Sequence, residues 1–307
     1  EYEPSGYLIP TTRHKQKVVY VLDNLRFYPG ETACDPLFAD LLRTYADYYV
    51  MDAFGAAHKP SASTNMLAER YDELHRSLGL LINEEIAGLA PLKDTSIPLL
   101  ALMGGAKLKT KLKLMHALIQ QRPNLSLFVG PALVFTLMRA QGNAVGDSLI
   151  DERLIEMGRE ILEIAQRMNT TLYLPLDYIS AQGSLEGPLH THDASSFSHS
   201  DLGLTIGPKT LAMLLPLIEQ APMVFCNASM GLESRPETLK PLQDILALMS
   251  ERAHTHYEVI AGGTTIEVAH KMGLLGQFSF CSTGGSAALA YIANQPLYGL
   301  EPFDPQT

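Results

Sequence analysis

From residue 97 onward, apolar runs of strand length alternate with amphipathic runs of helical length. This alternation is typical of a parallel sheet with helices on both faces. It predicts strands at 97–103, 125–129, 171–176, 222–226, 257–261 and 277–281. It predicts helices at 109–121, 131–140, 151–168, 209–219, 237–252, 264–272 and 285–293. The expected fold class is α/β, with a doubly wound, Rossmann-like parallel sheet that binds ligands beyond the carboxyl ends of its strands.

The first 80 residues give a sparser pattern, with strands expected at 17–22 and 48–51 and a helix near 36–45. Two strands cannot bury a sheet on both faces, so residues 1–80 are expected to form a partial, truncated α/β N-terminal domain. Residues 81–96 are expected to be an interdomain hinge helix, 97–295 the C-terminal domain, and 296–307 a tail that packs back on the first domain. Apolar side chains at helical spacing predict one or two helices within 65–92: Leu67, Tyr71, Leu74, Leu78 and Leu81.

Composition restricts the functional classes. A chain of 307 residues with 46% apolar content predicts two globular domains. The formal net charge of -10 argues against a nucleic-acid or anionic-membrane surface, because either needs concentrated positive charge. Cys34, Cys226 and Cys281 show no CxxC spacing, so neither a disulfide framework nor a cysteine zinc site is expected. No apolar run approaches the ~20 residues that span a bilayer, and residues 1–4 do not resemble a signal peptide, so a cytoplasmic location is expected.

Two strand-to-helix junctions contain paired glycines. An apolar strand runs through Gly262 and Gly263 into a helix, and Gly284 and Gly285 occupy the same place in the next βα unit. Such junctions direct free backbone N–H groups at an anion. The pair predicts a nucleotide site at which two helix N-termini converge. Phosphoryl transfer normally needs a carboxylate that holds Mg²⁺, and the first junction has Thr264 where an acid would be useful.

Several segments occur in the order in which they are found in the phosphoglycerate kinase family. Residues 23–31, DNLRFYPGE, resemble the family's ENLRFxxxE, and residues 52–58, DAFGAAH, resemble its DAFGTAHR. Further matches are GGAK at 104–107, the segment 135–142 followed by VG at 145–146, IGPKT at 206–210, MG at 230–231 and STGG at 282–285. These collinear motifs cover the chain from residue 17 on. By this resemblance the chain is identified as a member of the family.

The resemblance implies a phosphoglycerate-binding N-terminal domain and a nucleotide-binding C-terminal domain. Hinge closure would then allow phosphoryl transfer between 1,3-bisphosphoglycerate and ADP, a reaction of glycolysis. The implied substrate-binding residues are Arg26, His58 and Lys59. Lys59 stands where the family has arginine, so it keeps the charge and loses the bidentate geometry. From the residues alone, Arg26 could instead pair with Asp23 or Glu31.

The implied phosphate-binding lysines are Lys107 and Lys111, which lie at i and i+4 and share one helix face. Lys111 is the residue that the resemblance assigns to the transferring phosphoryl group, and this is its implied catalytic role. Lys109 and Lys113 leave open an alternative interpretation, in which this is a generally cationic helix whose charges are simply solvated. The resemblance implies ADP or ATP with Mg²⁺ as ligands, and its remaining nucleotide positions are Asn227, Gly262, Gly263, Thr264, Thr265, Gly284 and Gly285.

Three departures from the family pattern concern the nucleotide site. The family's GGGMAYTF appears as GPALVFTL at 130–137, whose added side chains are expected to narrow the adenine pocket. The ribose-binding glutamate falls on Ser234, with Glu233 one place early and expected to point elsewhere. Thr264 replaces the aspartate that holds Mg²⁺, and a hydroxyl is a poorer ligand for a hard dication. Thr264 could instead cap its helix. No residue is therefore assigned as a metal ligand in this site.

The expected function is that of a phosphoglycerate kinase-like protein whose catalysis is weak or lost. The family's N-terminal quarter, which carries most of the basic residues that hold the acid substrate, has no counterpart in this sequence. Uncovered strand edges in an incomplete first domain favour a partner or a second copy of the chain. The alternatives are an active kinase, a non-catalytic pseudokinase that binds nucleotide or another anion, and a purely structural or interaction protein.

One histidine-rich segment has no counterpart in the family. His190, His192 and Asp193 are followed by His199 and Asp201 in a serine-rich stretch. The pattern HxHD followed by HxD could bind zinc or another divalent ion. A polar surface loop is the alternative interpretation, because no regular element is expected there to fix the ligand geometry.

Overall fold

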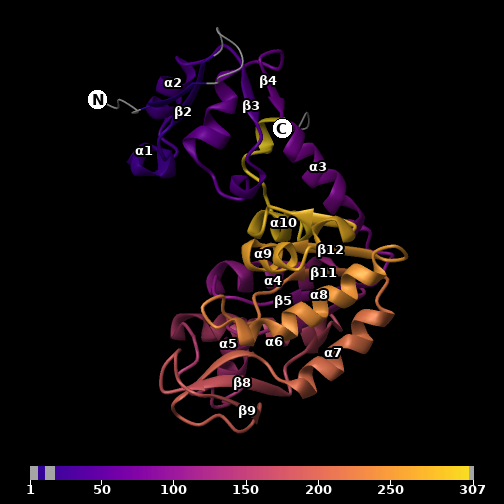
Figure 1. Ribbon diagram of the computed structural model, residues 1–307. Coiled ribbons are helices and arrows are strands. Elements are labelled where there is room, and N and C mark those ends of the chain that lie inside the picture. Colours follow the sequence, from indigo (N-terminus) through magenta and orange to yellow (C-terminus); the bar gives the residue numbers. More distant parts are fainter. Residues whose placement is uncertain (1–5, 11–17, 304–307) are drawn as a thin grey trace. The chain divides into compact units, whose positions relative to one another are not determined.

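The computed structural model describes residues 6–10 and 18–303, and these residues divide into two compact units (Figure 1). Unit 1 contains the chain up to Asn83 and from Pro296 onward, and unit 2 runs from Glu84 to Gln295. Lys17, where a strand is expected to begin, residues 1–4, which were compared with a signal peptide, and the end of the tail from 304 on lie outside the described residues. Within the described part, none of the helices has the length and apolar character needed to cross a lipid bilayer.

The centre of unit 2 is a six-stranded sheet in which all neighbouring strands are parallel. Its order is β13-β12-β11-β5-β6-β7, so the first and fourth strands of the sheet lie side by side in the middle. This doubly wound topology confirms the predicted fold class. It creates a topological switch point between β5 and β11. The strands are β5 (Leu99–Met103), β6 (Leu125–Val129), β7 (Thr171–Tyr173), β11 (Met223–Asn227), β12 (Tyr257–Ala261) and β13 (Phe280–Ser282).

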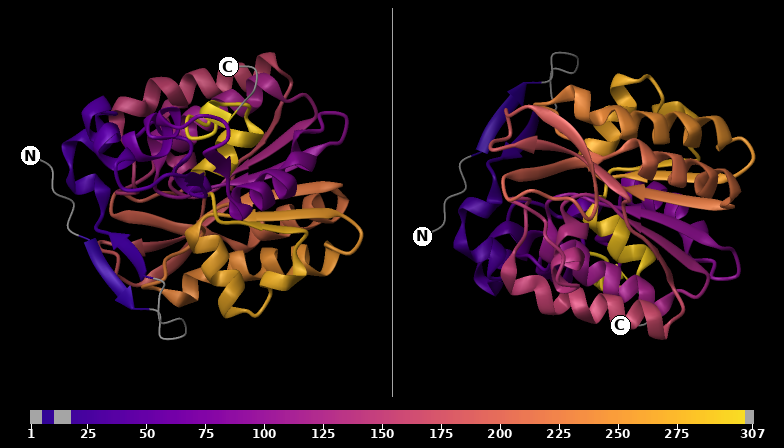
Figure 2. Two further views of the ribbon diagram at one scale, coloured as in Figure 1. Left: turned by 90° about the horizontal axis from the view of Figure 1, so that it is seen from above. Right: turned by 90° about the horizontal axis from the view of Figure 1, so that it is seen from below.

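Helices cover both faces of this sheet, as the two views in Figure 2 show. One face carries α4 (Leu108–Gln121), α5 (Leu133–Ala140), α6 (Ile155–Arg167) and α10 (Ser286–Ile292). The other carries α7 (Pro208–Gln220), α8 (Lys240–Arg252) and α9 (Gly263–Lys271).

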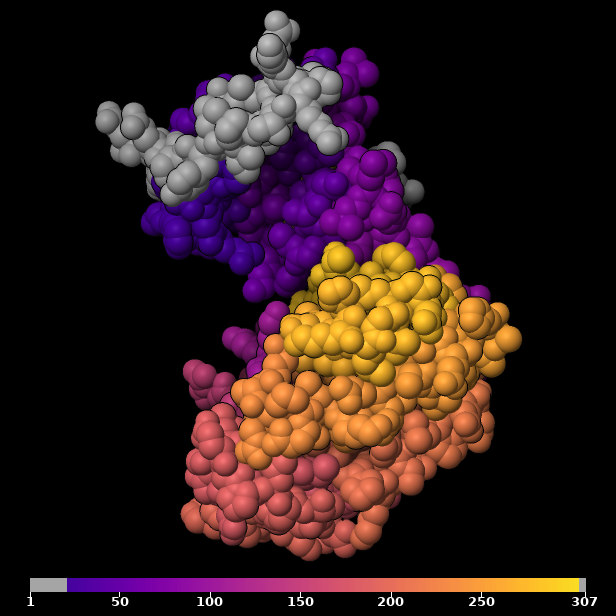
Figure 3. All heavy atoms as spheres, viewed as in Figure 1, coloured from indigo at the N-terminus to yellow at the C-terminus, as the bar shows by residue number. Residues whose placement is uncertain are grey.

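Every residue of β5 and β11 is buried, as expected for strands covered on both faces. In Figure 3 the orange and yellow segments of unit 2 form a continuous packed surface.

A second, antiparallel sheet of unit 2 contains the histidine-rich segment. Its order is β10-β8-β9, with β8 (Asp177–Gln182) between β9 (Leu189–Asp193) and β10 (Asp201–Ile206). The expectation that no regular element occurs here is therefore wrong. The polar composition of β9 hides it, because a strand exposed on one face lacks the continuous apolar run that identifies the buried strands.

Unit 1 contains two separate pairs of strands. β1 (Gly6–Pro10) pairs antiparallel with β2 (Val18–Leu22), and β3 (Tyr49–Met51) pairs parallel with β4 (Arg76–Leu78). In the sequence, the short helices α1 (Pro29–Thr32) and α2 (Pro36–Arg43) lie between β2 and β3. Phe38, Ala39 and Leu42 of α2 pack against the segment that follows β3.

The prediction of continuous helices in residues 65–92 is wrong for its first half. A π-turn at Ala62–Met66 and a 3-10 turn at Ala68–Arg70 lead into β4, and only α3 (Leu80–Leu89) is a regular helix. The Asp72 carboxylate accepts hydrogen bonds from the backbone N–H groups of Leu74 and His75, which forms a turn instead of a helix. Leu74 is 87% exposed, so its apolar side chain does not belong to a helix face in the core.

The chain returns to unit 1 after α10. The side-chain amide of Asn65 donates to the carbonyl of Tyr298 at 2.8 Å, and the N–H of Gly299 donates to the carbonyl of Ala57 at 3.0 Å. The ring of Phe303 stacks on that of Tyr49. Residues from both ends of the described chain thus build one unit.

Candidate functional site

A cavity of about 680 Å³ lies at the carboxyl edge of the large sheet, next to the switch point. Its volume is in the range of small-molecule sites. We call it the switch-point cavity. Its walls come from the loops after β5, β6, β11 and β12, from β10, and from the segment before α6. The lining residues are Gly105, Ala106, Pro131, Ala132, Phe135, Asp147, Ser148, Leu149, Leu185, Leu202, Gly203, Leu204, Ser229, Gly231, Leu232, Glu233, Ser234 and Thr264.

Gly105 brings the loops after β5 and β11 close together. It has a φ of +100°, and a Cβ atom added there would lie 3.1 Å from the Ser229 hydroxyl oxygen and 3.6 Å from Lys111 Nζ. The positive φ and the close approach both favour glycine. The floor of the cavity therefore depends on this residue.

Lys111 lies beneath the cavity floor, and its side chain is 8% exposed. Its ammonium group donates hydrogen bonds to the backbone carbonyls of Gly104 and, at 2.9 Å, Asn227. These carbonyls belong to the ends of β5 and β11, so Lys111 joins the two strands of the switch point. The pKa of Lys111 is lowered to about 8, mainly by burial; Cys226 acts in the opposite direction, and the charge of Lys107 adds to the lowering.

The structure places Lys107 and Lys111 in different surroundings. Lys107 is the exposed N-cap residue of α4, whereas Lys111 is buried one turn later. The i, i+4 spacing predicts a shared helix face, but Lys107 lies just before the first helical residue, Leu108, and its backbone is not helical. Lys109 and Lys113 are exposed.

Asn227 lies where the N-termini of α9 and α10 approach each other. Its amide nitrogen donates to the carbonyl of Gly285 at 3.2 Å. Gly262 and Gly285 have φ values of +93° and +52°, and a Cβ atom on Gly285 would lie 3.7 Å from the Gly262 Cα atom. The structure thus brings together Asn227 and the two predicted glycine junctions. Gly263 is exposed beside them, at the first position of α9.

The loop at Gly284 is held by a buried carboxylate from α3. Glu85, which is 1% exposed, accepts hydrogen bonds from the hydroxyl of Ser282 at 2.6 Å and from the N–H and hydroxyl of Thr283 at 2.7 and 2.6 Å. The hydroxyl of Ser282 in turn accepts from the N–H of Gly284. Sequence analysis did not identify Glu85, because its position in a helix gives no sign of the loop it contacts.

Thr264 and Thr265 have different roles at the start of α9. Thr264 lines the switch-point cavity, whereas Thr265 is buried and donates its hydroxyl to the carbonyl of Ala228 at 3.0 Å. The N-cap residue of α9 is Gly262, so the interpretation of Thr264 as a helix cap is wrong. The first turn of this helix, all of which is described, carries no acidic side chain.

The wall formed by the loop after β6 contains a non-glycine residue in a conformation that favours glycine. Ala132 has φ +67° and ψ −54° and precedes α5. Pro131, Ala132 and Phe135 line this cavity of about 680 Å³. A Cβ atom on Gly203 would lie 2.3 Å from the Phe135 ring, so the glycine lets this ring pack against β10.

The opposite wall contains the polar residues of the loop after β11. Ser234 and Glu233 both line the cavity, and Glu233 also interacts with Glu267 and Lys271 of α9. Asp147 and Ser148 also line the cavity, and Ser148 accepts a hydrogen bond from the N–H of Gly203 at 2.9 Å. The match at Val145 and Gly146 was the only signal in the sequence for this segment.

The predicted substrate-binding residues lie in unit 1. Arg26 belongs to an exposed 3-10 turn (Leu25–Phe27) after β2, and within the described residues no carboxylate forms an ion pair with it. Glu31, its suggested partner, is buried and accepts hydrogen bonds from Ser63. His58 is half-buried and Lys59 exposed, after the 3-10 turn that follows β3. Arg26 and His58 thus follow strands of two different sheets.

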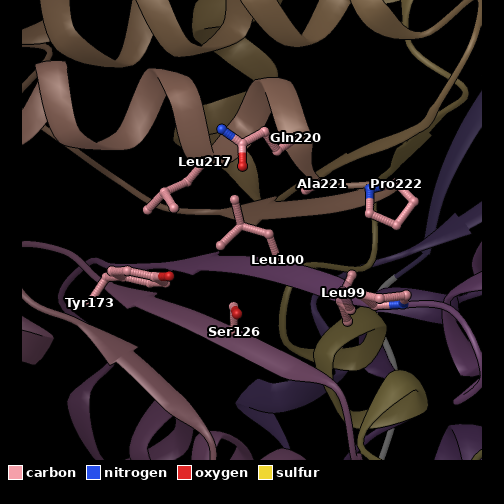
Figure 4. A pocket seen from close by; sticks show the side chains of 9 residues that line it. Leu99, Leu100, Ser126, Tyr173, Leu217, Gln220, Ala221 and Pro222 are labelled. Carbon is pink, nitrogen blue, oxygen red and sulfur yellow. The ribbon is translucent and has the colours of Figure 1, made fainter.

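A smaller cavity of about 220 Å³ lies near the amino ends of β5 and β11. Figure 4 shows Leu217 and Gln220 of α7 facing Leu100 and Ser126 of the sheet around it. Its lining residues, all of which are described, include no charged side chain, so it does not suit a phosphate.

Comparisons with known proteins agree with this architecture. A family model described as phosphoglycerate kinase matches residues 10–295. The chain is 32% identical to the phosphoglycerate kinase of Campylobacter concisus over 287 residues, or 92% of this chain and 71% of the relative. It is 36% identical to that of Anaeromyxobacter sp. over 290 residues, or 94% and 72%.

Solved structures give the same result. Phosphoglycerate kinase from Coxiella burnetii matches with a TM-score of 0.72 and 27% identity, covering 91% of this chain and 71% of that one. The structure from Pyrococcus horikoshii matches with a TM-score of 0.73 and the same coverage, and at 23% identity it shows the fold alone.

Proposed function

The chain belongs to the phosphoglycerate kinase family, and from this premise we propose that it binds an adenine nucleotide in the switch-point cavity while its phosphoryl transfer is weak or lost. The start of α9 carries the proposal. Thr264 lines the cavity there, in a helix turn without an acidic side chain. The family reaction transfers a phosphoryl group between 1,3-bisphosphoglycerate and ADP.

Nucleotide binding is supported by the two kinds of wall in the cavity. Phe135 and Leu204 offer apolar surface, whereas Gly105 and Ser229 present backbone and hydroxyl groups at the switch point. Ligands of doubly wound sheets bind at this place. An apolar pocket with a few convergent polar groups suits a base at one end and phosphates at the other.

The residues at α9 do not fit a nucleotide-bound Mg²⁺ ion. Mg²⁺ prefers carboxylate and phosphate oxygens in near-octahedral geometry. Thr264 offers a neutral hydroxyl, and Glu233 of the loop after β11 interacts with Glu267 and Lys271 of α9. The groups at the start of α9 therefore support binding of a nucleotide to which Mg²⁺ contributes little.

Lys111 supports the same conclusion. Its ammonium donates to two carbonyls and is largely screened from solvent, so its bonds would have to break before it could contact a transferring phosphoryl group. Losing one preorganised charged contact of this kind costs about 10²-fold or more in rate. Lys107, which is exposed, is the better candidate for a phosphate contact.

Arg26, His58 and Lys59 are proposed as a partial substrate site. The guanidinium of Arg26 is exposed without an ion-pair partner in the described residues, so it can bind a phosphate or carboxylate in two places. Lys59 supplies a positive charge, but its ammonium group lacks the bidentate geometry of a guanidinium. A non-catalytic role as a nucleotide- or anion-binding subunit is the second candidate, and the buried ammonium of Lys111 is the observation that favours it.

Titration calorimetry with ADP, with and without Mg²⁺, tests the proposal. We expect weak binding that changes little when Mg²⁺ is added. Thr264→Asp should make binding depend on Mg²⁺, whereas the matched variant Thr264→Asn, which has the same shape without the charge, should not. Micromolar, Mg²⁺-dependent binding by the unmodified chain would contradict the proposal.

A coupled assay of ATP formation from 1,3-bisphosphoglycerate and ADP separates the two candidate functions. Turnover slightly above background, lowered by Arg26→Ala, indicates a weak kinase. Nucleotide binding without turnover indicates the non-catalytic subunit. Turnover typical of an efficient kinase would show that another group replaces the missing acid.

A further inference from the structure

The small antiparallel sheet carries a group of metal-ligating side chains that the proposed nucleotide site does not use. His190 and His192 lie on β9, and Asp201 begins β10. One ligand atom from each lies within 4.8 Å of the others. We propose that these three side chains form a metal site for a divalent transition-metal ion, with Zn²⁺ as the best match.

The strand geometry brings the three side chains to one face. His190 and His192 are two residues apart on a strand, so they project to the same side. Ser180 of β8 lies opposite His190, and Gly203 of β10 lies opposite Ser180. Because Ser180 and Gly203 are small, the imidazoles can reach across β8 towards β10. His190 Nε2 lies 3.2 Å from Asp201 Oδ1, and His192 Nε2 lies 3.8 Å from Oδ2.

His192 has the tautomer that a metal ligand needs. Its Nδ1 lies 3.0 Å from the carbonyl oxygen of Asp193, which can only accept, so Nδ1 carries the proton. Nε2 then holds the lone pair, which accepts from the hydroxyl of Ser180 at 2.8 Å. A metal ion would replace this hydroxyl proton at Nε2, and the Ser180 hydroxyl would turn away. An imidazole whose second nitrogen donates to a backbone carbonyl is the usual support of a metal-bound histidine. The Phe197 ring, 4.5 Å away and perpendicular, fixes the plane of the imidazole.

Asp201 supplies an independent indication of a missing cation. The residue is 1% exposed, and its Oδ1 accepts no hydrogen bond within the described residues, although Oδ2 accepts from the N–H of Ser198 at 2.7 Å. A buried carboxylate whose oxygen accepts no hydrogen bond is costly unless a cation compensates it, and a metal ion bound by Oδ1 and the neighbouring His190 Nε2 would do so.

The donor set indicates the class of metal. Two imidazole nitrogens and one carboxylate oxygen suit Zn²⁺ and neighbouring transition ions, whereas Mg²⁺ and Ca²⁺ prefer all-oxygen sites. Three protein ligands leave the fourth tetrahedral position to water. His199 and Asp193 are excluded, because His199 is exposed outside the cluster and Asp193 pairs with Lys209 at 2.5 Å. The sequence pattern therefore named two residues too many.

Equilibrium dialysis of the whole metal-free chain against Zn²⁺ tests the proposal, with metal analysis as the readout. We expect one Zn²⁺ per chain, which excess Mg²⁺ does not displace. His190→Ala should weaken binding by at least about 10-fold, the lower range seen even for residues that only support a ligand. The matched control His199→Ala removes a histidine of the same segment and should leave the affinity unchanged.

Cobalt(II) provides a second readout that does not depend on affinity. A tetrahedral site with nitrogen ligands gives Co²⁺ a visible absorption band, which Zn²⁺ should abolish and which the His190→Ala chain should lack. Circular dichroism of the variants shows that the fold is kept. Failure to bind stoichiometric Zn²⁺, or an equal loss of affinity in the His190→Ala and His199→Ala chains, would overturn the proposal.

Discussion

Ala132 occupies a backbone conformation that residues with a Cβ atom rarely adopt. Its φ of +67° places the methyl group close to its own backbone, which costs about 1–2 kcal/mol. Such outliers are common at ligand sites, where the surrounding structure maintains them. Here the loop after β6 must turn sharply into α5 to form the wall of the switch-point cavity.

Ala132→Gly should therefore stabilise the protein. Relief of the strained φ outweighs the larger entropy of glycine in the unfolded chain, and we expect a gain of about 1 kcal/mol in the free energy of unfolding. The control Ala140→Gly changes a residue with helical geometry at the end of α5 and should cost about 0.5–1 kcal/mol. Urea unfolding of both variants measures the difference. A loss of stability in Ala132→Gly would show that the conformation is not strained.

Lys111 should make stability depend on pH. Burial lowers its pKa from 10.5 to about 8, so between these values the unfolded chain binds more protons than the folded one. The free energy of unfolding then rises with pH in this window, by about 1 kcal/mol per pH unit for this residue. Unfolding curves at pH 8 and 9.5 for the unmodified chain, Lys111→Met and Lys107→Met isolate the effect. The rise should persist in Lys107→Met and vanish in Lys111→Met.

Element packing depends on a buried ion pair between α8 and β12. Arg252 donates to Glu258 at 2.6 Å and to the carbonyl of Ala221 at 2.6 Å, and the side chains are 9% and 0% exposed. Removing one member of such a pair leaves a buried charge without compensation, whereas replacing both by apolar residues is often tolerated.

The single change Glu258→Leu should cost about 3–5 kcal/mol of stability. The double variant Arg252→Met with Glu258→Leu should lose less than the single one, because no buried charge remains. Denaturant unfolding of the two single variants and the double variant gives the coupling energy. Additive losses would mean that the pair contributes nothing as a pair.

Strands with a continuous apolar run were predictable from the sequence, whereas a strand exposed on one face was not. The predicted ranges 125–129 and 257–261 agree with β6 and β12 because continuous apolar runs bounded by turns leave little choice. β9, in contrast, is polar along its length and is held by pairing with β8. Leu74 shows the opposite failure, because helical spacing predicted a buried position for a side chain that a turn exposes.

The site was predictable where a glycine or a motif fixes the backbone. Gly262 and Gly285 lie together as the two junctions suggested, and Asn227, which the resemblance indicated, lies beside them. The spacing of the two lysines could not reveal that Lys111 is buried while Lys107 is exposed. That difference depends on the contacts of Lys111 with the ends of β5 and β11. The role of Glu85 could not be predicted either, because it depends on a contact with Thr283, which is distant in the sequence.

At the scale of the whole molecule, the switch-point cavity belongs to unit 2 alone. We expect ADP to slow backbone hydrogen exchange in the loops at 104–106, 229–234 and 262–265, and to leave α2 of unit 1 unchanged. Binding stabilises only the parts whose opening releases the ligand, by about 1.4 kcal/mol at tenfold excess over Kd. Exchange monitored by mass spectrometry decides this. Protection confined to unit 1 would place the nucleotide elsewhere.

The return of the chain to unit 1 has a consequence for how the protein is made. Tyr49, Ala57 and Asn65 leave the ribosome before residues 84–295, but their contacts with Phe303, Gly299 and Tyr298 can form only after those residues have been synthesised. At cellular elongation rates this interval lasts roughly 10–40 s. Unit 2 is contiguous and can complete its sheet first, so unit 1 begins to be translated before unit 2 and is completed after it.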